Sequence, residues 1–258
     1  MPRLKLELAY TGGNFHGWQL QPGLRTVQGV LEQALERICK VGVRVYGAGR
    51  TDAGAHALGQ VAHLDLPENK VHVPWQKALN ALLPWDVAVL RASWCDTEFH
   101  ARFKALAKEY SYTLWTQEEY LLPQREPFVW KVGKLDLQAM QEAAEVLQGR
   151  HDFRAVQNVG TTVQSTVRNL QRIDFSPGFF PQETVIHFFA DGFLKQMARN
   201  LASCLVAVGT RRMDVSSLQN ILNSGQRQLA PATAPAKGLC LQRVCYPEGL
   251  GGDYAADC

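Results

Sequence analysis

The sequence predicts a mixed α+β protein whose two halves repeat one order of secondary structure elements. Runs in which apolar and polar residues alternate predict strands, and apolar residues at helical spacing predict the helices between them. Both halves follow the order strand, helix, strand, strand, helix, strand, which is the order of the ferredoxin-like fold. We therefore expect two ferredoxin-like βαββαβ halves with antiparallel sheets joined side by side, at residues 1–105 and 106–258.

The first half starts with a strand in which leucines alternate with Lys5 and Glu7, a pattern that predicts one buried face. Thr26 is the expected N-cap of the first helix, whose apolar residues continue to Ile38. The second helix is expected to start at Pro74, because proline suits the first turn of a helix. Strands are expected at residues 4–10, 43–46, 57–66 and 87–94.

The second half repeats this order without repeating the amino acids. Its longest helix carries an apolar stripe from Phe193 to Val208, and a shorter helix follows Asp214. Another helix is expected at residues 136–147, and Gly149 suits its C-terminal end. Strands are expected at residues 106–116, 166–175, 184–190 and 239–246. No linker-like composition marks the boundary near residues 104–106, so we expect the two halves to pack tightly.

Length and composition restrict the class of protein. The chain has 258 residues, of which 46% are hydrophobic and 20% are charged, which excludes a disordered chain, a coiled coil and a collagen-like repeat. No apolar run is long enough to predict a membrane-spanning helix. The N-terminus lacks the apolar core of a secretory signal, so we expect a cytoplasmic protein that does not bind membranes.

Positive charge is concentrated late in the chain. The formal net charge is only +3, but residues 195–243 contain seven lysines and arginines against the single acid Asp214. A local positive field of this kind suits a polyanion such as RNA, and RNA-recognition modules share the predicted order of elements. A solvated basic surface without a partner explains the same charge equally well.

The segment Gly47–His56 holds the residues most suggestive of chemistry. Glycine and other small residues surround Arg50 and Asp52, so a ligand can approach the carboxylate closely while the arginine keeps it ionised. The spacing of the glycines does not fit a dinucleotide fingerprint, and no phosphate-binding lysine follows them. The alternative is a tight turn in which Arg50 and Asp52 form a structural pair.

Other candidate groups are weaker. His56 and His63 are possible general bases, although a lone histidine is more often a packed or surface residue. No second acid stands near Asp52 in the sequence, and no nucleophile elbow for serine chemistry is present. The six cysteines form no zinc-binding pattern, so we expect neither a metal nor an organic cofactor. The aromatic residues of the loop Asn14–Pro22 can either stack on bases or pack against the sheet.

Taken together, these motifs resemble the tRNA pseudouridine synthase A family, and the resemblance runs nearly from end to end. The two most specific blocks are Gly49–Gly54, which reads G-R-T-D-A-G, and Phe99–Phe103, which reads F-H-A-R-F. The other matching segments are Tyr10–Gly12, Phe15–Gln19, Thr26–Gly29, His56, Gly59–Val61, Tyr110–Tyr112, Asp152–Phe153, Phe193–Leu194, Met197–Asn200 and Gly238–Leu239.

This resemblance implies a pseudouridine synthase fold with its active-site cleft between the two halves. It implies an isomerase that needs no cofactor and converts uridine to pseudouridine at positions 38, 39 and 40, in the anticodon stem-loop of tRNA. Asp52 matches the family's catalytic aspartate, its nucleophile, whereas Tyr110, Arg50 and Arg199 match residues that bind the substrate. A homodimer that holds one tRNA across both subunits is also implied. The resemblance leaves open how Glu109, where many members carry a basic residue, affects RNA affinity.

The implied chemistry agrees with the residues. Uracil must leave C1′ of the ribose, turn over and rejoin through C5, which requires one carboxylate near the sugar instead of a hydrolytic pair. Whether Asp52 attacks C1′ or removes the 2′ proton stays open. Two rival classes are a non-catalytic RNA-binding protein and a nucleotide-metabolising enzyme, and pseudouridine formation on unmodified tRNA separates them from the isomerase.

Overall fold

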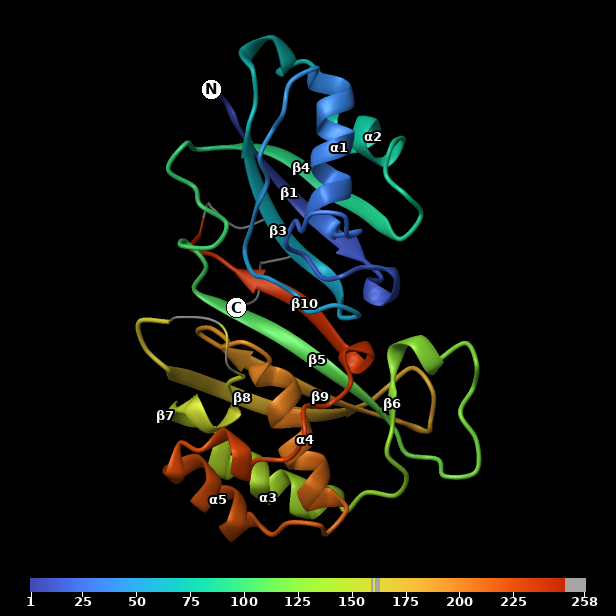
Figure 1. Cartoon of the computed structure of the whole chain (residues 1–258), viewed down its shortest axis with the longest axis vertical. Helices are drawn as coiled ribbons and strands as arrows, with labels where there is room; N and C mark the ends of the chain where they lie inside the picture. The colour runs from blue at the N-terminus through green and yellow to red at the C-terminus, as the bar shows by residue number, and fades with distance from the viewer. Residues whose placement is uncertain (159, 161–162, 249–258) are drawn as a thin grey trace. The chain divides into compact units, whose positions relative to one another are not determined.

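The computed structural model describes residues 1–158, 160 and 163–248, and it contains two compact units (Figure 1). Among the described residues, the first unit comprises residues 1–107 and 240–248, and the second lies between Lys108 and Leu239. Each unit combines helices with a mostly antiparallel sheet, so the predicted mixed α+β class is confirmed.

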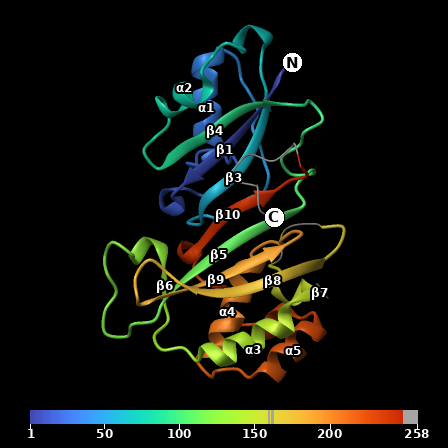
Figure 2. The same ribbon diagram turned by 180° about the vertical axis from the view of Figure 1, so that it is seen from behind.

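The first unit is built on three long strands. They are β1 (Arg3–Tyr10), β3 (His56–Asp65) and β4 (Val87–Cys95). Strand β1 lies in the middle and pairs antiparallel with both neighbours, and the short β2 (Tyr46–Gly47) pairs with β3. Helices α1 (Val27–Cys39) and α2 (Trp75–Asn80) contact one another beside this sheet (Figures 1 and 2). The predicted cap of α1 is confirmed, since the Thr26 hydroxyl accepts a hydrogen bond from the Gly29 amide.

Strand β1 is buried on both faces, whereas the sequence predicted one buried face. Lys5 and Glu7, the expected solvent-facing residues, are 5% and 6% exposed. The ammonium group of Lys5 lies over the ring of Phe99, and Phe99 in turn packs against Tyr246. The expectation was wrong because residues distant in the sequence cover the second face of a central strand.

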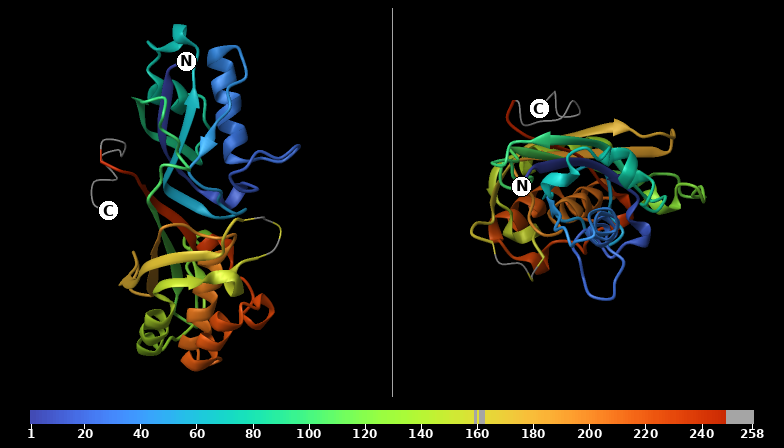
Figure 3. Two further views of the ribbon diagram at one scale, coloured as in Figure 1. Left: turned by 90° about the vertical axis from the view of Figure 1, so that its left-hand side faces the viewer. Right: turned by 90° about the horizontal axis from the view of Figure 1, so that it is seen from above.

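The second unit contains a four-stranded antiparallel sheet. In spatial order its strands are β5 (Ala107–Trp115), β9 (Glu183–Ala190), β8 (Val167–Pro177) and β7 (Gly149–Asp152). The short β6 (Trp130–Lys131) pairs parallel with β5. The helices of this unit are α3 (Leu137–Leu147), α4 (Met197–Gly209) and α5 (Val215–Ser224), and they gather together in the views of Figure 3. No helix in the described part of the chain has the length and apolarity that crossing a membrane requires.

Several elements differ from the expected pattern: the strand expected at residues 43–46 is only β2 at Tyr46–Gly47, and β6 and β7 were not expected. Helix α4 begins at Met197 instead of Phe193, because Gln196 adopts the left-handed conformation with φ of 61° and interrupts the helix. Strand β10 (Leu239–Cys245), expected in the second half, pairs parallel with the start of β3 and belongs to the first unit. Gly59 makes this pairing possible, because a Cβ atom there would lie 2.2 Å from the Gln242 carbonyl oxygen.

Candidate functional site

Arg50 and Asp52 lie on the turn that connects β2 to β3 in the first unit. The backbone folds tightly here, since the Ala55 amide donates to the Asp52 carbonyl at 3.1 Å. Thr51 between them is buried, whereas Asp52 is half-buried and Arg50 is exposed. The turn thus buries its middle residue, whereas Asp52 is partly and Arg50 largely accessible to solvent.

A buried polar cluster holds this turn from below. The hydroxyl groups of Tyr10 and Thr51 form a hydrogen bond of 2.8 Å, and the side-chain amide of Gln60 donates to the Gly49 carbonyl at 2.9 Å. Burial raises the pKa of Tyr10 far above its ordinary value, so its hydroxyl keeps its proton at neutral pH. Two strands, β1 through Tyr10 and β3 through Gln60, therefore fix both sides of Arg50. The sequence pattern places Tyr10 at the end of a strand and within a family motif, but it assigns Tyr10 no role at the turn.

The loop after β1 packs directly on the same turn. The Trp18 amide donates to the Thr51 carbonyl at 3.1 Å, and the Gly54 amide donates to the Phe15 carbonyl at 3.3 Å. Gly17 has a φ of +88°, and a Cβ atom there would lie 2.7 Å from the Thr51 carbonyl oxygen. Only glycine satisfies both the backbone conformation and the close approach, so this loop and the turn form one unit.

The aromatic residues of this loop pack inside the protein. Trp18 is 3% exposed, and its indole lies so close to Gly47 that an added Cβ would come within 2.6 Å of the ring. Phe15 is also buried, and the Arg25 guanidinium lies 4.0 Å from the centre of its ring. Arg25 is itself held by both carboxylate oxygens of Asp86. Of the two interpretations left open by the sequence, packing describes Phe15 and Trp18.

Both candidate histidines have structural partners. The Nδ1 atom of His56 accepts a hydrogen bond from the Gly12 amide at 3.0 Å, and Nδ1 of His63 accepts one from the Ala101 amide at 3.2 Å. Burial, followed by the charges of His100 and Arg3, lowers the pKa of His63 to about 4. An imidazole Nδ1 that accepts a backbone hydrogen bond carries no proton. Both rings are also buried. The structure therefore assigns His56 and His63 to packing and to backbone support.

Tyr110 lies on β5 in the second unit, directly opposite Phe188 of β9. Its side chain is 7% exposed and its ring packs edge-on against Phe193, with ring centres 4.9 Å apart. The neighbouring Glu109 has a carboxylate oxygen 3.4 Å from Nδ1 of His187. Tyr110 thus sits at the rim of the packed core, with little freedom to reorient.

Arg199 lies in the first turn of α4 and is half-buried. Its Nε atom donates to the Ala234 carbonyl at 2.7 Å, so it is not the solvated helix charge that a basic surface alone would imply. Its charge also acts on Tyr112, whose hydroxyl donates to the Pro235 carbonyl at 2.6 Å. Burial raises the pKa of Tyr112 far above its ordinary value, so Tyr112 is a neutral hydrogen-bond donor. The second unit therefore holds Tyr110 and Arg199, and the first holds Arg50 and Asp52.

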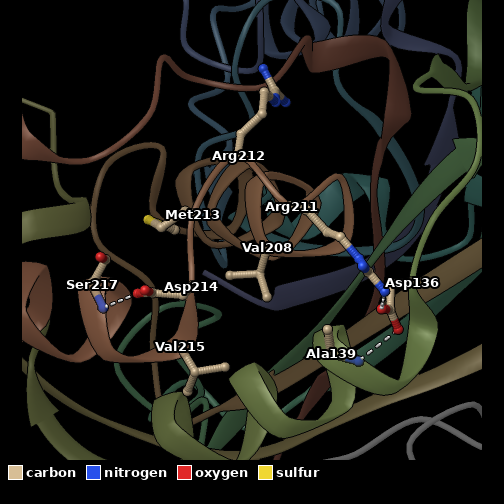
Figure 4. A pocket seen from close by; sticks show the side chains of 9 residues that line it. All are labelled: Asp136, Ala139, Val208, Arg211, Arg212, Met213, Asp214, Val215 and Ser217. Carbon is tan, nitrogen blue, oxygen red and sulfur yellow. Dashed lines mark hydrogen bonds and ion pairs between the residues drawn. The ribbon is translucent and has the colours of Figure 1, made fainter.

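The basic stretch 195–243 is not a uniform charged face. Lys237 pairs with Glu126, and Arg227 donates hydrogen bonds to neighbouring loop carbonyls. Arg211 extends to Asp136 at 3.0 Å, whereas Arg212 points away from that pair (Figure 4). Both arginines border a hollow of about 460 Å³. Much of the charge that the sequence shows is therefore engaged in internal contacts.

The hollow lies where two helices begin, and polar and apolar side chains line it in similar measure. Asp136 and Asp214 cap α3 and α5 by accepting hydrogen bonds from the amides of Ala139 and Ser217. The pKa of the Asp136 carboxyl is lowered, mainly by the hydrogen bond that it accepts from the Ala139 amide. The pKa of the Asp214 carboxyl is also lowered, mainly by its hydrogen bonds with Ser217. Across the described residues, no three histidine, cysteine, aspartate or glutamate side chains gather closely enough to hold a metal ion.

Gly17→Ala is expected to loosen the turn that carries Asp52. The new methyl group clashes with the Thr51 carbonyl, and the left-handed backbone adds a strain of about 1 kcal/mol. Gly23→Ala is the matched control, because Gly23 has a φ of +73° but nothing within 4 Å of an added Cβ. Hydrogen exchange at the Trp18 and Gly54 amides should accelerate in Gly17→Ala and stay close to wild type in Gly23→Ala. Equal exchange in the two variants would show that the close approach does not hold the turn.

Comparison with known proteins places this chain in a family. A family model described as tRNA pseudouridine synthase matches residues 8–104 and 143–247. The chain is 53% identical over 251 residues to tRNA pseudouridine synthase A of Solidesulfovibrio magneticus, an alignment that covers 95% of this chain and 92% of that protein. It is 49% identical over 253 residues to tRNA pseudouridine synthase A of Maridesulfovibrio salexigens, covering 98% and 93% of the two chains.

Likeness to solved structures is more distant. The structure described as "Crystal Structure of a Cbf5-Nop10-Gar1 Complex" aligns with 93% of this chain and 58% of that chain, at 10% identity and a TM-score of 0.36. That likeness is too weak to support a conclusion about function. The family model matches most of the chain and the two relatives match nearly all of it, including the turn of Arg50 and Asp52, and this chain therefore belongs to the tRNA pseudouridine synthase family.

Proposed function

We propose that this enzyme isomerises uridine to pseudouridine at positions 38, 39 and 40 in the anticodon stem and loop of tRNA. The observation that carries the proposal is the turn of Arg50 and Asp52, where a half-buried carboxylate stands on a rigidly held backbone. Relatives named tRNA pseudouridine synthase A match over 95% of the chain or more. A single carboxylate presented in this way suits chemistry at the sugar of a nucleotide.

The reaction needs neither water nor an oxidant, because substrate and product have the same atoms. The bond between N1 of uracil and C1′ breaks, the base turns over, and C5 forms a new bond to C1′. The proton that leaves C5 is matched by one that N1 gains. Asp52 is the catalytic residue in this proposal and acts either as the nucleophile at C1′ or as the base at C2′. We propose no metal and no organic cofactor for these steps.

The other three residues bind the substrate. Tyr110 lies against the base and is positioned to accept the C5 proton, because Phe193 and the sheet fix its ring. Arg50 is exposed beside Asp52, which suits it to hold the RNA strand after the target base leaves its stack. Arg199 supplies a guanidinium whose direction is set by the Ala234 carbonyl.

The proposal extends to the architecture and to partners. In the first unit, the strand order β4-β1-β3 with two helices supports a ferredoxin-like half, and we propose a second ferredoxin-like half from the order β5, α3, β8, β9 and α4 in the second unit. tRNA is the proposed partner, held by a homodimer in the cytoplasm. The experiment that tests the function is incubation with unmodified tRNA transcripts, followed by mapping of pseudouridine at each of the three positions. Binding of tRNA without any product would favour the non-catalytic alternative.

Asp52→Asn and Asp52→Ala should both abolish turnover, with a fall of about 1,000-fold or more in the single-turnover rate. The amide keeps the shape of the side chain but cannot act as nucleophile or base. Affinity for tRNA should stay within about threefold of wild type, measured by filter binding, because one side chain contributes little to a large polyanion contact. An Asp52→Asn enzyme within tenfold of the wild-type rate would rule out the catalytic assignment.

Tyr110→Phe keeps the ring that packs on Phe193 and removes only the hydroxyl group. If the hydroxyl takes the C5 proton, the single-turnover rate should fall by about 100-fold or more while tRNA affinity changes little. Thermal unfolding provides the control, since the packing of the ring is unchanged. A near-normal rate would leave Tyr110 with the packing role that its place on β5 already explains.

Replacing Arg211 and Arg212 with alanine should weaken tRNA binding and spare the rate at saturating tRNA. Arg211 is held by Asp136, so we expect Arg212 to account for most of the change. The slope of log affinity against log salt should become shallower by about one or two units. Arg154→Ala is the control, because Arg154 is an exposed arginine paired with Asp152 in the acidic part of the chain. An unchanged salt slope in the double variant would mean that this surface does not contact RNA.

A further inference from the structure

A short segment without regular structure, Ala230–Pro235, accepts a side-chain hydrogen bond at each of its residues. Each of its six residues offers one oxygen to a side chain from elsewhere in the second unit. The donors are Arg227 to Ala230, Pro231 and Thr233, Ser203 to Ala232, Arg199 to Ala234, and Tyr112 to Pro235. The segment is rich in alanine and proline, so its own side chains and amides offer few means of fixing it.

Arg227 is the centre of this arrangement. Its guanidinium donates to the carbonyls of Ala230 and Pro231 at 3.2 and 3.0 Å, and to the hydroxyl of Thr233 at 3.0 Å. The same group also bonds Asn158 Oδ1 at 2.7 Å and Asn200 Oδ1 at 3.0 Å. All five of these acceptors are uncharged. These contacts therefore depend on the directed N–H donors of the planar guanidinium, and not on attraction to a carboxylate.

The two asparagines connect this arrangement to the rest of the unit. Asn200 lies in α4, is completely buried, and donates to the Val156 carbonyl at 2.8 Å and to Asn158 at 3.0 Å. Asn158 also donates to Thr233 at 3.2 Å, so it contacts both the helix and the segment. Arg227 therefore joins the segment to the first turn of α4, the same turn that carries Arg199.

The contact between Ala234 and Arg199 gives this network a consequence for the substrate site. The Ala234 carbonyl accepts the Nε–H of Arg199 at 2.7 Å, which fixes one edge of that guanidinium. Arg227 donates hydrogen bonds to Pro231 and Thr233, which lie three residues and one residue before Ala234 in the chain. A shift of the segment would move the acceptor and reorient Arg199.

We propose that Arg227 is a positioning residue for uridine isomerisation, which fixes the segment Ala230–Pro235 and, through the Ala234 carbonyl, the guanidinium of Arg199. The inference rests on the proposed function, in which Arg199 binds the substrate. In this inference Arg227 has an internal role, and its charge is not available to bind RNA. The contrary interpretation is that Arg227 only stabilises the fold.

The test is a double-mutant cycle between Arg227→Lys and Arg199→Ala. Lysine keeps the charge but cannot reproduce the five directed hydrogen bonds. We expect Arg227→Lys to lower the single-turnover rate at saturating tRNA by about tenfold or more, while the Kd for tRNA stays within about twofold. The double variant should be no slower than Arg199→Ala alone, because the two residues act through one guanidinium. Arg154→Lys is the matched control and should keep the wild-type rate, since Arg154 is an exposed arginine outside this network.

The outcomes separate the inference from the function on which it rests. A normal rate in Arg227→Lys, with only a lower Tm, would overturn the positioning role, as would a double variant whose losses multiply. If Arg199→Ala keeps the wild-type rate, the route through Arg199 is wrong although the enzyme is still an isomerase. A wild-type enzyme that forms no pseudouridine would refute the proposed function itself. If Arg227→Lys does not fold, Arg227→Gln, which buries no unpaired charge, takes its place in the cycle, and the same rates and affinities support or overturn the positioning role.

Discussion

The candidate catalytic turn depends on the close contact between two stretches of backbone in the first unit. The loop after β1 donates and accepts main-chain hydrogen bonds with the turn that carries Asp52, at Trp18 and at Phe15. Gly17 allows this approach, because any larger residue would bring a Cβ atom within 2.7 Å of the Thr51 carbonyl. The carboxylate is therefore placed by backbone geometry, and the side chains around it mainly keep that geometry from relaxing.

The second unit achieves the same rigidity with polar side chains instead of glycines. Tyr112, Arg199, Ser203 and Arg227 all donate to the oxygens of the segment Ala230–Pro235. Such a network is stable only when each buried polar group has a partner, because an unpaired group in the interior costs about 1–3 kcal/mol. It also explains why the positive charge of this stretch is a poor measure of RNA-binding surface. Several of its cations already serve as internal donors.

The first unit also buries charged residues, but there one carboxylate oxygen of Glu7 has no hydrogen-bond partner among the described residues. Lys5 and Glu7 lie in the interior beside Phe99 and Tyr246, although their alternation with leucine is typical of a surface strand face. His56 and His63 are likewise enclosed, with Nδ1 of each ring accepting a backbone amide. Several titratable residues in this protein therefore have a structural role. Their residue type alone does not distinguish them from the candidate catalytic residue Asp52.

The sequence by itself determined the mixed α+β class, most strands and helices, the cap at Thr26, and the family to which the Arg50 and Asp52 motif belongs. These properties depend on the local spacing of residues and on short motifs, both of which are visible in the linear sequence. Only the tertiary structure decided that β10 pairs with β3, that both faces of β1 are buried, and that Arg227 and Arg199 share one segment. Those outcomes depend on which distant residues cover a face or accept a hydrogen bond. The spacing of apolar and polar residues does not specify these distant contacts, because the same spacing is compatible with several pairing partners.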